Sequence, residues 1–289
     1  MATSGYIDLH SHTTESDGSY APEELVDLAV RTDLKALAIT DHDTFSGYEM
    51  ALPFARKAGL DLVRGIELNS RLNLTNGDGR SAHLLGLFPS REPSGEFINW
   101  IEDQRRDRRD RNRKLAETLQ NRGVRVTLEE AEGRGRNLTS RTHFAQILME
   151  KGYVDTFEEA FREYLGEDAP SYVARQSLTS EEVIRRIRSG GGIPVVAHPV
   201  RLSLGRDIER QELIKLKEAG LIALEIYHSD QDPQLQAYYH QLARELDLLP
   251  TGGSDFHGRI KPDIDLGTGL RGNVRVPFEF LQRLRELMP

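Results

Sequence analysis

The sequence predicts an α/β protein built on a parallel sheet or barrel, with a helical insert. Short apolar runs alternate with helical patterns over much of the 289 residues, which is typical of βα units. One long stretch between two of these runs is helical throughout and lacks a convincing strand. A chain of this length can bury the core of one large domain together with a smaller inserted piece.

Seven apolar runs are the predicted strands: residues 6–10, 36–40, 62–68, 83–88, 193–198, 221–227 and 248–253. Helix signals lie between several of them. Pro22 opens the first helical pattern at a first-turn position, and Thr179 with Glu182 forms a capping-box pattern before another. Further helices are expected around residues 54–59, 212–220 and 235–246.

Residues 95–177 form the predicted insert, between the barrel segments 1–94 and 178–289. Three polar residues interrupt the apolar stripe of its first helix: Arg105, Arg108 and Asn112. The two arginines are either solvated or turned toward a polar cavity or a phosphate, and the sequence leaves both interpretations open.

Composition excludes several classes of function. The formal net charge of -8 disfavours broad attraction to long nucleic acid or to an anionic membrane. Because the chain has no cysteine, metal chemistry must rest on histidine and carboxylate. No apolar stretch reaches the ~18 residues of a membrane span, and the first residues lack the features of a signal peptide. We therefore expect a soluble, cytoplasmic protein without a membrane partner.

Histidines and acids gather at the predicted strand ends. The residues concerned are His10, His12, Asp17, His42, Glu67, His83, His198, Asp255 and His257. Each alone is weak evidence, since a lone histidine is more often a satisfied polar side chain. Because the carboxyl ends of parallel strands meet at one rim, we expect the whole set to converge there and bind divalent metal. Nine ligands exceed the need of one tetrahedral ion, which predicts two or three ions with Glu67 as a bridge.

These motifs resemble those of the PHP superfamily, named for polymerase and histidinol phosphatase domains. The resemblance lies in HSH with Asp17, in TDH, in the AHP around His198 and in the final SDFH. It implies a distorted (β/α)7 TIM-like barrel that carries a cluster of two or three ions. The implied ligand sets are His10, His12, Glu67 and Asp255 for one ion, Glu67, His83 and His198 for a second, and Asp17, His42 and His257 for a third.

Within the superfamily, the insert and the SRTHFA stretch at residues 140–145 are most similar to nucleoside 3′,5′-bisphosphate phosphatases and to 5′ to 3′ exonucleases acting on very short RNA. Dedicated histidinol phosphatases usually lack such an insert. This branch implies manganese, although the ligand types also admit zinc, iron or magnesium.

The resemblance implies hydrolysis of a phosphate ester by a hydroxide that bridges two ions, so the nine ligands are also the expected catalytic residues. Candidate substrate contacts are Arg201, Arg141, His143 and His228. Arg201 lies three residues beyond His198, and an arginine fork can donate two hydrogen bonds to a phosphate. Arg141 and His143 belong to the insert, which we expect to cover the active site. For His228 a substrate contact, a leaving-group acid and a polar strand end remain open, as does a simple helix-start role for Arg141.

The expected substrate is a small phosphorylated nucleotide or a short oligonucleotide, and no protein partner is predicted. The first hypothesis is removal of the 3′-phosphate from nucleoside 3′,5′-bisphosphates such as adenosine 3′,5′-bisphosphate. The second is a nuclease that trims short RNA or DNA from the 5′ end. Hydrolysis of histidinol phosphate and a metal-stabilised module without turnover rank below both.

Overall fold

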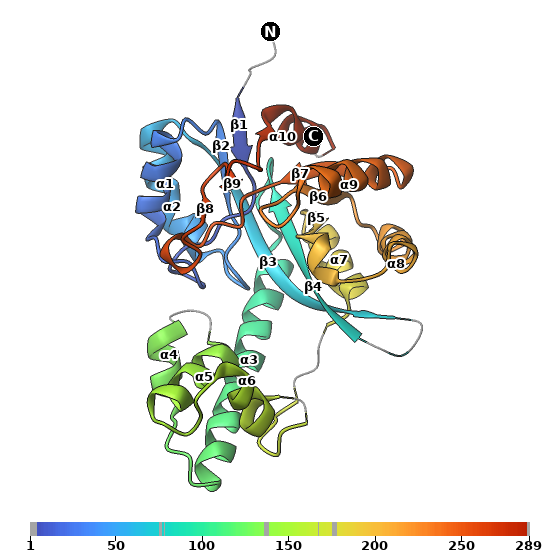
Figure 1. The fold of residues 1–289 in the computed structure, drawn as a ribbon. Coiled ribbons are helices and arrows are strands. Elements are labelled where there is room, and N and C mark those ends of the chain that lie inside the picture. Colours follow the sequence, from blue (N-terminus) through green and yellow to red (C-terminus); the bar gives the residue numbers. More distant parts are fainter. Residues whose placement is uncertain are drawn as a thin grey trace. The chain divides into compact units, whose positions relative to one another are not determined.

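Figure 1 shows the computed structural model, which describes residues 5–287 except 75–76, 78, 136–138, 167 and 175–177. The chain divides into two compact units. The first unit comprises Met1–Ile98 and Ser177–Pro289, and the second comprises Asn99–Gln176. The long helix α3 (Gly95–Asn121) begins in the first unit and continues into the second.

The first unit contains an eight-stranded sheet that is nearly closed into a barrel, in the order β10-β1-β2-β3-β4-β5-β6-β7. Its strands are β1 (Tyr6–Asp8), β2 (Ala36–Ile39), β3 (Asp61–Asn73), β4 (Gly79–Phe88), β5 (Ile193–Val196), β6 (Ala223–Tyr227), β7 (Leu249–Gly252) and β10 (Val276–Pro277). Strands β1 to β7 overlap the seven predicted runs, although β3 continues to Asn73 and β4 already begins at Gly79. The expected α/β barrel is thereby confirmed.

Hydrogen bonds between the chain segments that follow β1 and β7 close the ring. The backbone N–H of His12 donates to the carbonyl of Phe256, and that of Asp255 donates to the carbonyl of His10, both at 2.9 Å. Ser11 and Phe256 form a parallel bridge in the same place. This pairing sets the HSH motif beside the SDFH motif, although the two are separated by almost the whole chain.

Strand β4 departs from the parallel arrangement that the sequence suggested. It runs antiparallel to both β3 and β5, whereas β1 to β3 and β5 to β7 are parallel. Residues 74–78, which join β3 to β4, are far fewer than the roughly dozen that a parallel crossover needs, so the two strands form a hairpin. Asn69 pairs with His83, which therefore lies in the first half of its strand and not at a carboxyl end.

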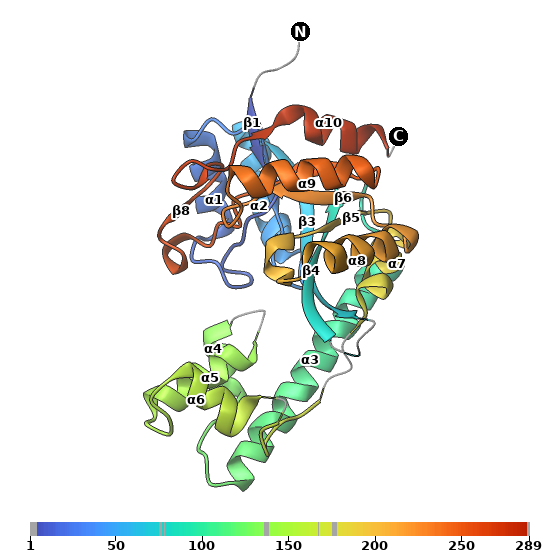
Figure 2. The same ribbon diagram turned by 45° about the vertical axis from the view of Figure 1, so that its right-hand side comes forward.

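Helices pack against the outside of the barrel (Figure 2). They are α1 (Pro22–Arg31), α2 (Ser46–Ala58), α7 (Ser180–Ser189), α8 (Arg206–Glu218), α9 (Pro233–Glu245) and α10 (Phe278–Glu286), with short turns η2 (Pro199–Leu202) and η3 (Gly258–Ile260) and a small ribbon of β8 (Ile264–Asp265) and β9 (Gly269–Leu270). The Thr179 side chain accepts from the Glu182 N–H, as predicted for the start of α7. Among the residues that the structure describes, no helix has the length and apolarity needed to cross a membrane.

Buried aliphatic side chains fix the strands of the barrel to the helices. One apolar cluster contains Ile7 of β1, Val63 of β3, Val195 of β5 and Leu281 of α10, each 1% exposed or less. Burial of such side chains is the main favourable contribution to folding, at about 25 cal/mol per Å². The strand ends that carry the polar motifs therefore project from a tightly packed base.

The second unit is helical and has its own apolar core. It contains most of α3, followed by α4 (Leu128–Gly135), α5 (Arg141–Glu150), α6 (Phe157–Ala160) and the π-helical turn η1 (Phe161–Leu165). Asn112 is buried and donates to the Thr139 carbonyl at 2.9 Å, and Arg105 ion-pairs with Glu102 of its own helix at 3.0 Å. Among the polar residues that interrupt the apolar stripe of α3, Asn112 therefore has a structural role within the second unit.

Gly253 provides a test of the ring closure. A Cβ atom at this position would lie 2.3 Å from the backbone nitrogen of His10 and 2.4 Å from its Cβ, closer than real contacts permit. We expect Gly253→Ala to cost about 1–3 kcal/mol, which lowers Tm by roughly 2–10 °C in a protein of this size. Gly205→Ala is the control, since φ there is -65° and no described heavy atom lies within 4 Å of the added methyl group. Equal melting temperatures for the two variants would contradict the proposed steric limit.

Candidate metal centre

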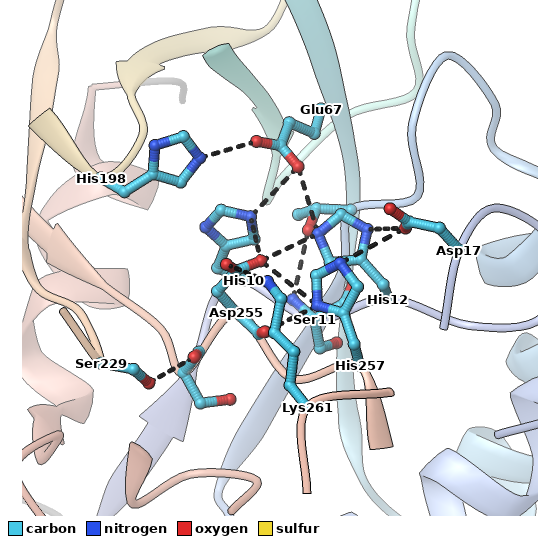
Figure 3. A network of polar contacts seen from close by, with 12 residues as sticks. His10, Ser11, His12, Asp17, Glu67, His198, Ser229, Asp255, His257 and Lys261 are labelled. Carbon is cyan, nitrogen blue, oxygen red and sulfur yellow. Dashed lines mark hydrogen bonds and ion pairs between the residues drawn. The ribbon is translucent and has the colours of Figure 1, made fainter. Parts of the chain in front are cut away.

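The nine candidate ligands lie together at one rim of the barrel. Figure 3 labels all of them except His42 and His83. His10, His12 and Asp17 follow β1, His42 follows β2, Glu67 lies in β3, His83 in β4, His198 after β5, and Asp255 and His257 after β7. Six of them are buried, and Asp17, His42 and His83 are half-buried. Convergence at the rim therefore follows from the order of the strands around the barrel.

Glu67 stands at the centre of the cluster. Its Oε2 atom lies near three imidazole Nε2 atoms, at 3.1 Å from His12, 3.3 Å from His10 and 3.4 Å from His42. Its Oε1 atom lies near two further imidazoles, at 2.7 Å from His83 Nδ1 and 3.1 Å from His198 Nε2. The two oxygens thus face different histidine sets, as a carboxylate that bridges two ions would.

Two aspartates complete the cluster. Asp255 Oδ1 lies 3.3 Å from His12 Nε2 and 3.5 Å from His10 Nε2. Asp17 Oδ1 lies 3.4 Å from both His12 Nδ1 and His257 Nε2. Asp17 thus contacts one histidine near the start of the chain and one near its end, and it links the segment after β1 to the segment after β7.

The ligand atoms fall into three groups, each compact enough for one ion. The groups are His10, His12, Glu67 and Asp255; His12, Asp17 and His257; and His42, Glu67 and His83. The first is the same set that the resemblance implies. The other two differ from the implied sets, since His12 takes the place of His42 beside Asp17 and His257, and His42 takes the place of His198 beside Glu67 and His83. His198 belongs to none of the three groups and lies 3.1 Å from Glu67 Oε1. The assignment of individual ligands to individual ions stays a prediction.

The donor set fits a divalent cation. The Nε2 atom of His12 is buried and has no hydrogen-bond partner among the described residues, although two carboxylate oxygens lie within 3.3 Å. An orphaned imidazole nitrogen that faces carboxylate oxygens is the arrangement that a shared ion would satisfy. Imidazole and carboxylate ligands admit manganese, zinc, iron and magnesium alike.

The electrostatics of the cluster show how strongly its charges are coupled. Burial raises the pKa of Glu67, but the imidazoles of His42 and His83 outweigh burial and hold that pKa well below its usual range. Burial lowers the pKa of His12, yet the nearby carboxylates of Asp255, Glu67 and Asp17 outweigh burial and raise it to about 10. In the metal-free protein, protonated His12 thus offsets part of the negative charge of the buried carboxylates.

Sequence reasoning assigned no role to Glu225, which lies in β6 and is fully buried. Its Oε1 atom accepts from His10 Nδ1 at 2.9 Å, which leaves the Nε2 lone pair of His10 free to face the cluster. Its Oε2 atom accepts from the backbone N–H of His198 at 2.6 Å. His198 has a φ of 29°, an unfavourable value for a residue with a side chain. One carboxylate thus positions two candidate ligands on different strands.

Asp41 performs a similar function for the loop between HSH and Asp17. It accepts from the Thr13 N–H at 2.8 Å, from the Thr13 hydroxyl at 2.7 Å and from the Ser16 hydroxyl at 2.6 Å. Asp41 is buried, and burial raises its pKa. The side chain therefore holds the loop that presents Asp17.

Two of the four predicted substrate contacts lie beside the cluster. Arg201 Nη1 is 3.0 Å from Asp255 Oδ2, and its Nε donates to Asp230 at 2.7 Å. His228 is fully buried, with Nε2 at 3.4 Å from Asp255 Oδ2. The Nδ1 atom of His228 accepts from the Asp230 N–H at 3.0 Å, so the ring proton resides on Nε2. His228 is thus oriented as a hydrogen-bond donor.

The other two, Arg141 and His143, belong to the second unit. Arg141 donates to the Leu165 carbonyl at 3.0 Å, and its guanidinium lies 5.6 Å from the ring centre of Tyr172. His143 Nδ1 accepts from the Ser140 N–H at 3.1 Å as part of a capping box at the start of α5. Both residues have defined roles within their unit. Their contact with substrate stays a prediction, and so does the expectation that this unit covers the site.

A barrel with a convergent histidine and carboxylate rim is typical of metal-dependent hydrolases. The chain belongs to the PHP domain family, whose sequence profile matches residues 8–171.

Individual proteins of this kind resemble the chain over nearly its whole length. It is 33% identical over 267 residues to a 5′-3′ exoribonuclease of Escherichia coli, covering 91% of this chain and 88% of the relative. It is 30% identical over 270 residues to a 3′,5′-nucleoside bisphosphate phosphatase of Chromobacterium violaceum, covering 90% of each. A solved structure from Bifidobacterium adolescentis, described as a metal-dependent phosphoesterase, superposes with a TM-score of 0.74 at 29% identity, covering 96% of this chain and 94% of that one.

The raised pKa of His12 predicts that metal binding is linked to proton release. At pH 7 an imidazole with a pKa of about 10 is protonated, and a metal ion binds only its neutral form. We expect Mn²⁺ binding to release protons and its affinity to fall, by about tenfold per pH unit for each proton displaced, as the pH is lowered. Calorimetric titrations in buffers of different ionisation enthalpy count these protons. A binding heat that is independent of the buffer would contradict the expectation.

The position of Glu225 predicts that it supports metal binding without contacting the ion. In Glu225→Gln the side-chain amide must face either His10 or the backbone N–H of His198, and one hydrogen bond is lost. We expect metal affinity to fall roughly 10–100-fold, measured by equilibrium dialysis. Glu209→Gln is the matched control, since Glu209 is also a buried carboxylate and accepts from the Tyr239 hydroxyl at 3.0 Å, away from the cluster. Equal affinities in the two variants would refute the assignment.

Proposed function

We propose that this metal-dependent phosphoesterase removes the 3′-phosphate from nucleoside 3′,5′-bisphosphates, such as adenosine 3′,5′-bisphosphate. The observation that carries the proposal is the match to the Chromobacterium violaceum phosphatase, which spans 90% of each chain and so includes the helical second unit. The convergence of all nine candidate ligands at one rim supports it.

The residues that would hold two or three divalent ions are His10, His12, Asp17, His42, Glu67, His83, His198, Asp255 and His257. Manganese is our proposed ion, and it suits a mixed set of imidazole and carboxylate ligands. When bound, such ions supply a nucleophilic hydroxide near neutral pH and positive charge for the transition state. The chain contains no cysteine, so no thiolate competes for this role.

The chain's own side chains orient the substrate. Arg201 presents a guanidinium beside Asp255, where its fork can bind phosphate oxygens. His228 presents a buried N–H at Nε2, which we assign as a donor to a substrate oxygen. Glu225 and Asp41 hold the candidate ligands and so keep the site preorganised.

A second candidate function is 5′ to 3′ exonuclease activity on short RNA or DNA. The Escherichia coli exoribonuclease matches 91% of this chain, as completely as the phosphatase does. Both reactions break the ester on the 3′ side of a 5′-phosphorylated nucleotide, so one site can serve both. The net charge of -8 disfavours long polymers but not oligomers of a few nucleotides.

The manganese-loaded protein should release phosphate from adenosine 3′,5′-bisphosphate and leave AMP and histidinol phosphate intact. A 5′-phosphorylated RNA trimer in the same assay reports nuclease activity. His10→Ala should lower turnover about 100-fold or more, because it removes a ligand from the most completely buried group. His240→Ala is the control, since His240 lies on α9 and contacts the Tyr227 hydroxyl instead.

The outcomes separate the candidates. Cleavage of the trimer alone would establish the nuclease and exclude the phosphatase. Absence of any hydrolysis by protein that retains two or more ions would refute both substrate assignments and leave the metal centre standing.

A further inference from the structure

The Oδ2 atom of Asp255 is approached by more hydrogen-bond donors than are needed to orient a metal ligand. Its Oδ1 atom faces the HSH motif, whereas three groups approach Oδ2, at 2.8 Å from Lys261 Nζ, 3.0 Å from Arg201 Nη1 and 3.4 Å from His228 Nε2. Figure 3 shows Lys261 reaching toward this aspartate from the loop after SDFH. One donor is enough to orient a carboxylate ligand. Two full positive charges at the same oxygen call for another explanation.

The charge balance at this edge changes when a cation binds. Within the described part of the chain, Asp255 is the one carboxylate that ion-pairs with Lys261, and Arg201 has Asp230 as a second partner at 2.7 Å. A divalent ion bound to Oδ1 would be partly neutralised by the negative charge of Asp255, and less of that charge would remain to balance Lys261 and Arg201. The edge formed by Lys261 and Arg201 then carries excess positive charge, in a protein whose net charge is -8.

Both cationic side chains keep donors available to a ligand. Lys261 is 32% exposed and Arg201 is 39% exposed, whereas Asp255 is only 3% exposed. An ammonium group has three N–H donors and a guanidinium group has five. The contacts to Asp255 and Asp230 engage one donor of Lys261 and two of Arg201. These contacts leave the other N–H groups of two partly exposed side chains, which lie beside the candidate ligand Asp255.

The backbone fixes the direction of Arg201. The turn η2 that carries it lies between His198, with a φ of 29°, and Ser203, with a φ of 52°. Left-handed conformations are unfavourable for residues with side chains and persist where the surrounding structure enforces them. Lys261 follows η3 directly, and its N–H donates to the Gly258 carbonyl at 3.1 Å.

We propose that Lys261 and Arg201 form an anion subsite that holds the substrate phosphate that is not hydrolysed. This role rests on the proposed function, because the 5′-phosphate is common to nucleoside 3′,5′-bisphosphates and to short 5′-phosphorylated oligonucleotides. The candidate ligands on the Oδ1 side of Asp255 serve the reacting phosphate, and the two cations on the Oδ2 side serve the second one. Lys261 is thereby a specificity-determining residue for 5′-phosphorylated substrates.

Binding of AMP and of adenosine to the manganese-loaded protein tests the subsite without turnover. The wild type should prefer AMP, and Lys261→Met should weaken AMP binding about tenfold or more while adenosine binding is unchanged. Lys261→Arg should retain most of the preference, because it keeps the charge. Lys217→Met is the matched control, since Lys217 is also ion-paired, with Asp247 at 3.4 Å, and is 37% exposed.

Because Lys261 contacts Asp255, the metal content of each variant must be measured alongside. If Lys261→Met loses metal and binds AMP and adenosine equally poorly, Lys261 only supports Asp255 and the subsite is refuted. An unchanged AMP preference in Lys261→Met refutes it as well.

Kinetics distinguish the two phosphates. Lys261→Met should raise KM for adenosine 3′,5′-bisphosphate about tenfold and leave KM for adenosine 3′-monophosphate unchanged. An equal loss for both substrates would assign the cations to the reacting phosphate and overturn the proposal. If the wild type hydrolyses neither substrate, the proposed function fails on its own. The AMP preference and its loss in Lys261→Met then still decide whether the subsite exists.

Discussion

The structure of the rim depends on one buried carboxylate, that of Glu67. A carboxylate removed from water is costly unless positive or hydrogen-bonding groups surround it closely. The two oxygens of Glu67 face five imidazoles, which come from the segments after β1, β2 and β5 and from β4. These imidazoles offset the cost of burying the carboxylate only when all the strands that carry them are correctly positioned. The burial of Glu67 therefore couples the geometry of the rim to the folding of the whole barrel.

Other buried acids near the rim are not candidate ligands, and they accept hydrogen bonds from backbone N–H groups instead. Asp8 accepts from the N–H groups of His10 at 3.1 Å, Ser254 at 3.0 Å and Gly267 at 2.8 Å, and so joins the two motifs at the point where the ring closes. Glu225 and Asp41 act in the same way on neighbouring segments. Each is a strand-end or mid-strand acid whose oxygens are occupied by the protein itself. A rim supported at three separate places resists the mutual repulsion of its ligand carboxylates when no cation is bound.

The strands, and the candidate ligands that follow β1, β2, β5 and β7, were predictable from the sequence because apolar runs locate the strand ends. Glu67 and His83 instead lie inside the longer strands β3 and β4. Two residues to which the structure gives a role carry no such signal. Glu225 lies inside the apolar run ALEIY, where no alternation shows which face of the sheet it occupies. Lys261 lies in a loop, whose path no periodicity predicts. The antiparallel direction of β4 was readable in principle, since residues 74–78 are too few for a parallel crossover.

The charge distribution explains why a negatively charged protein can act on anionic esters. Exposed charges more than about 8 Å away are largely screened at physiological ionic strength, so the net charge of -8 opposes approach only weakly. Affinity must then come from short-range contacts, which in the proposed subsite would be those of Arg201 and Lys261 beside Asp255, together with any bound cation. Such contacts serve a compact ligand that reaches all of them at once. A long polymer would gain little from contacts confined to one rim, which is the physical basis for proposing a small nucleotide or a short oligonucleotide as the substrate.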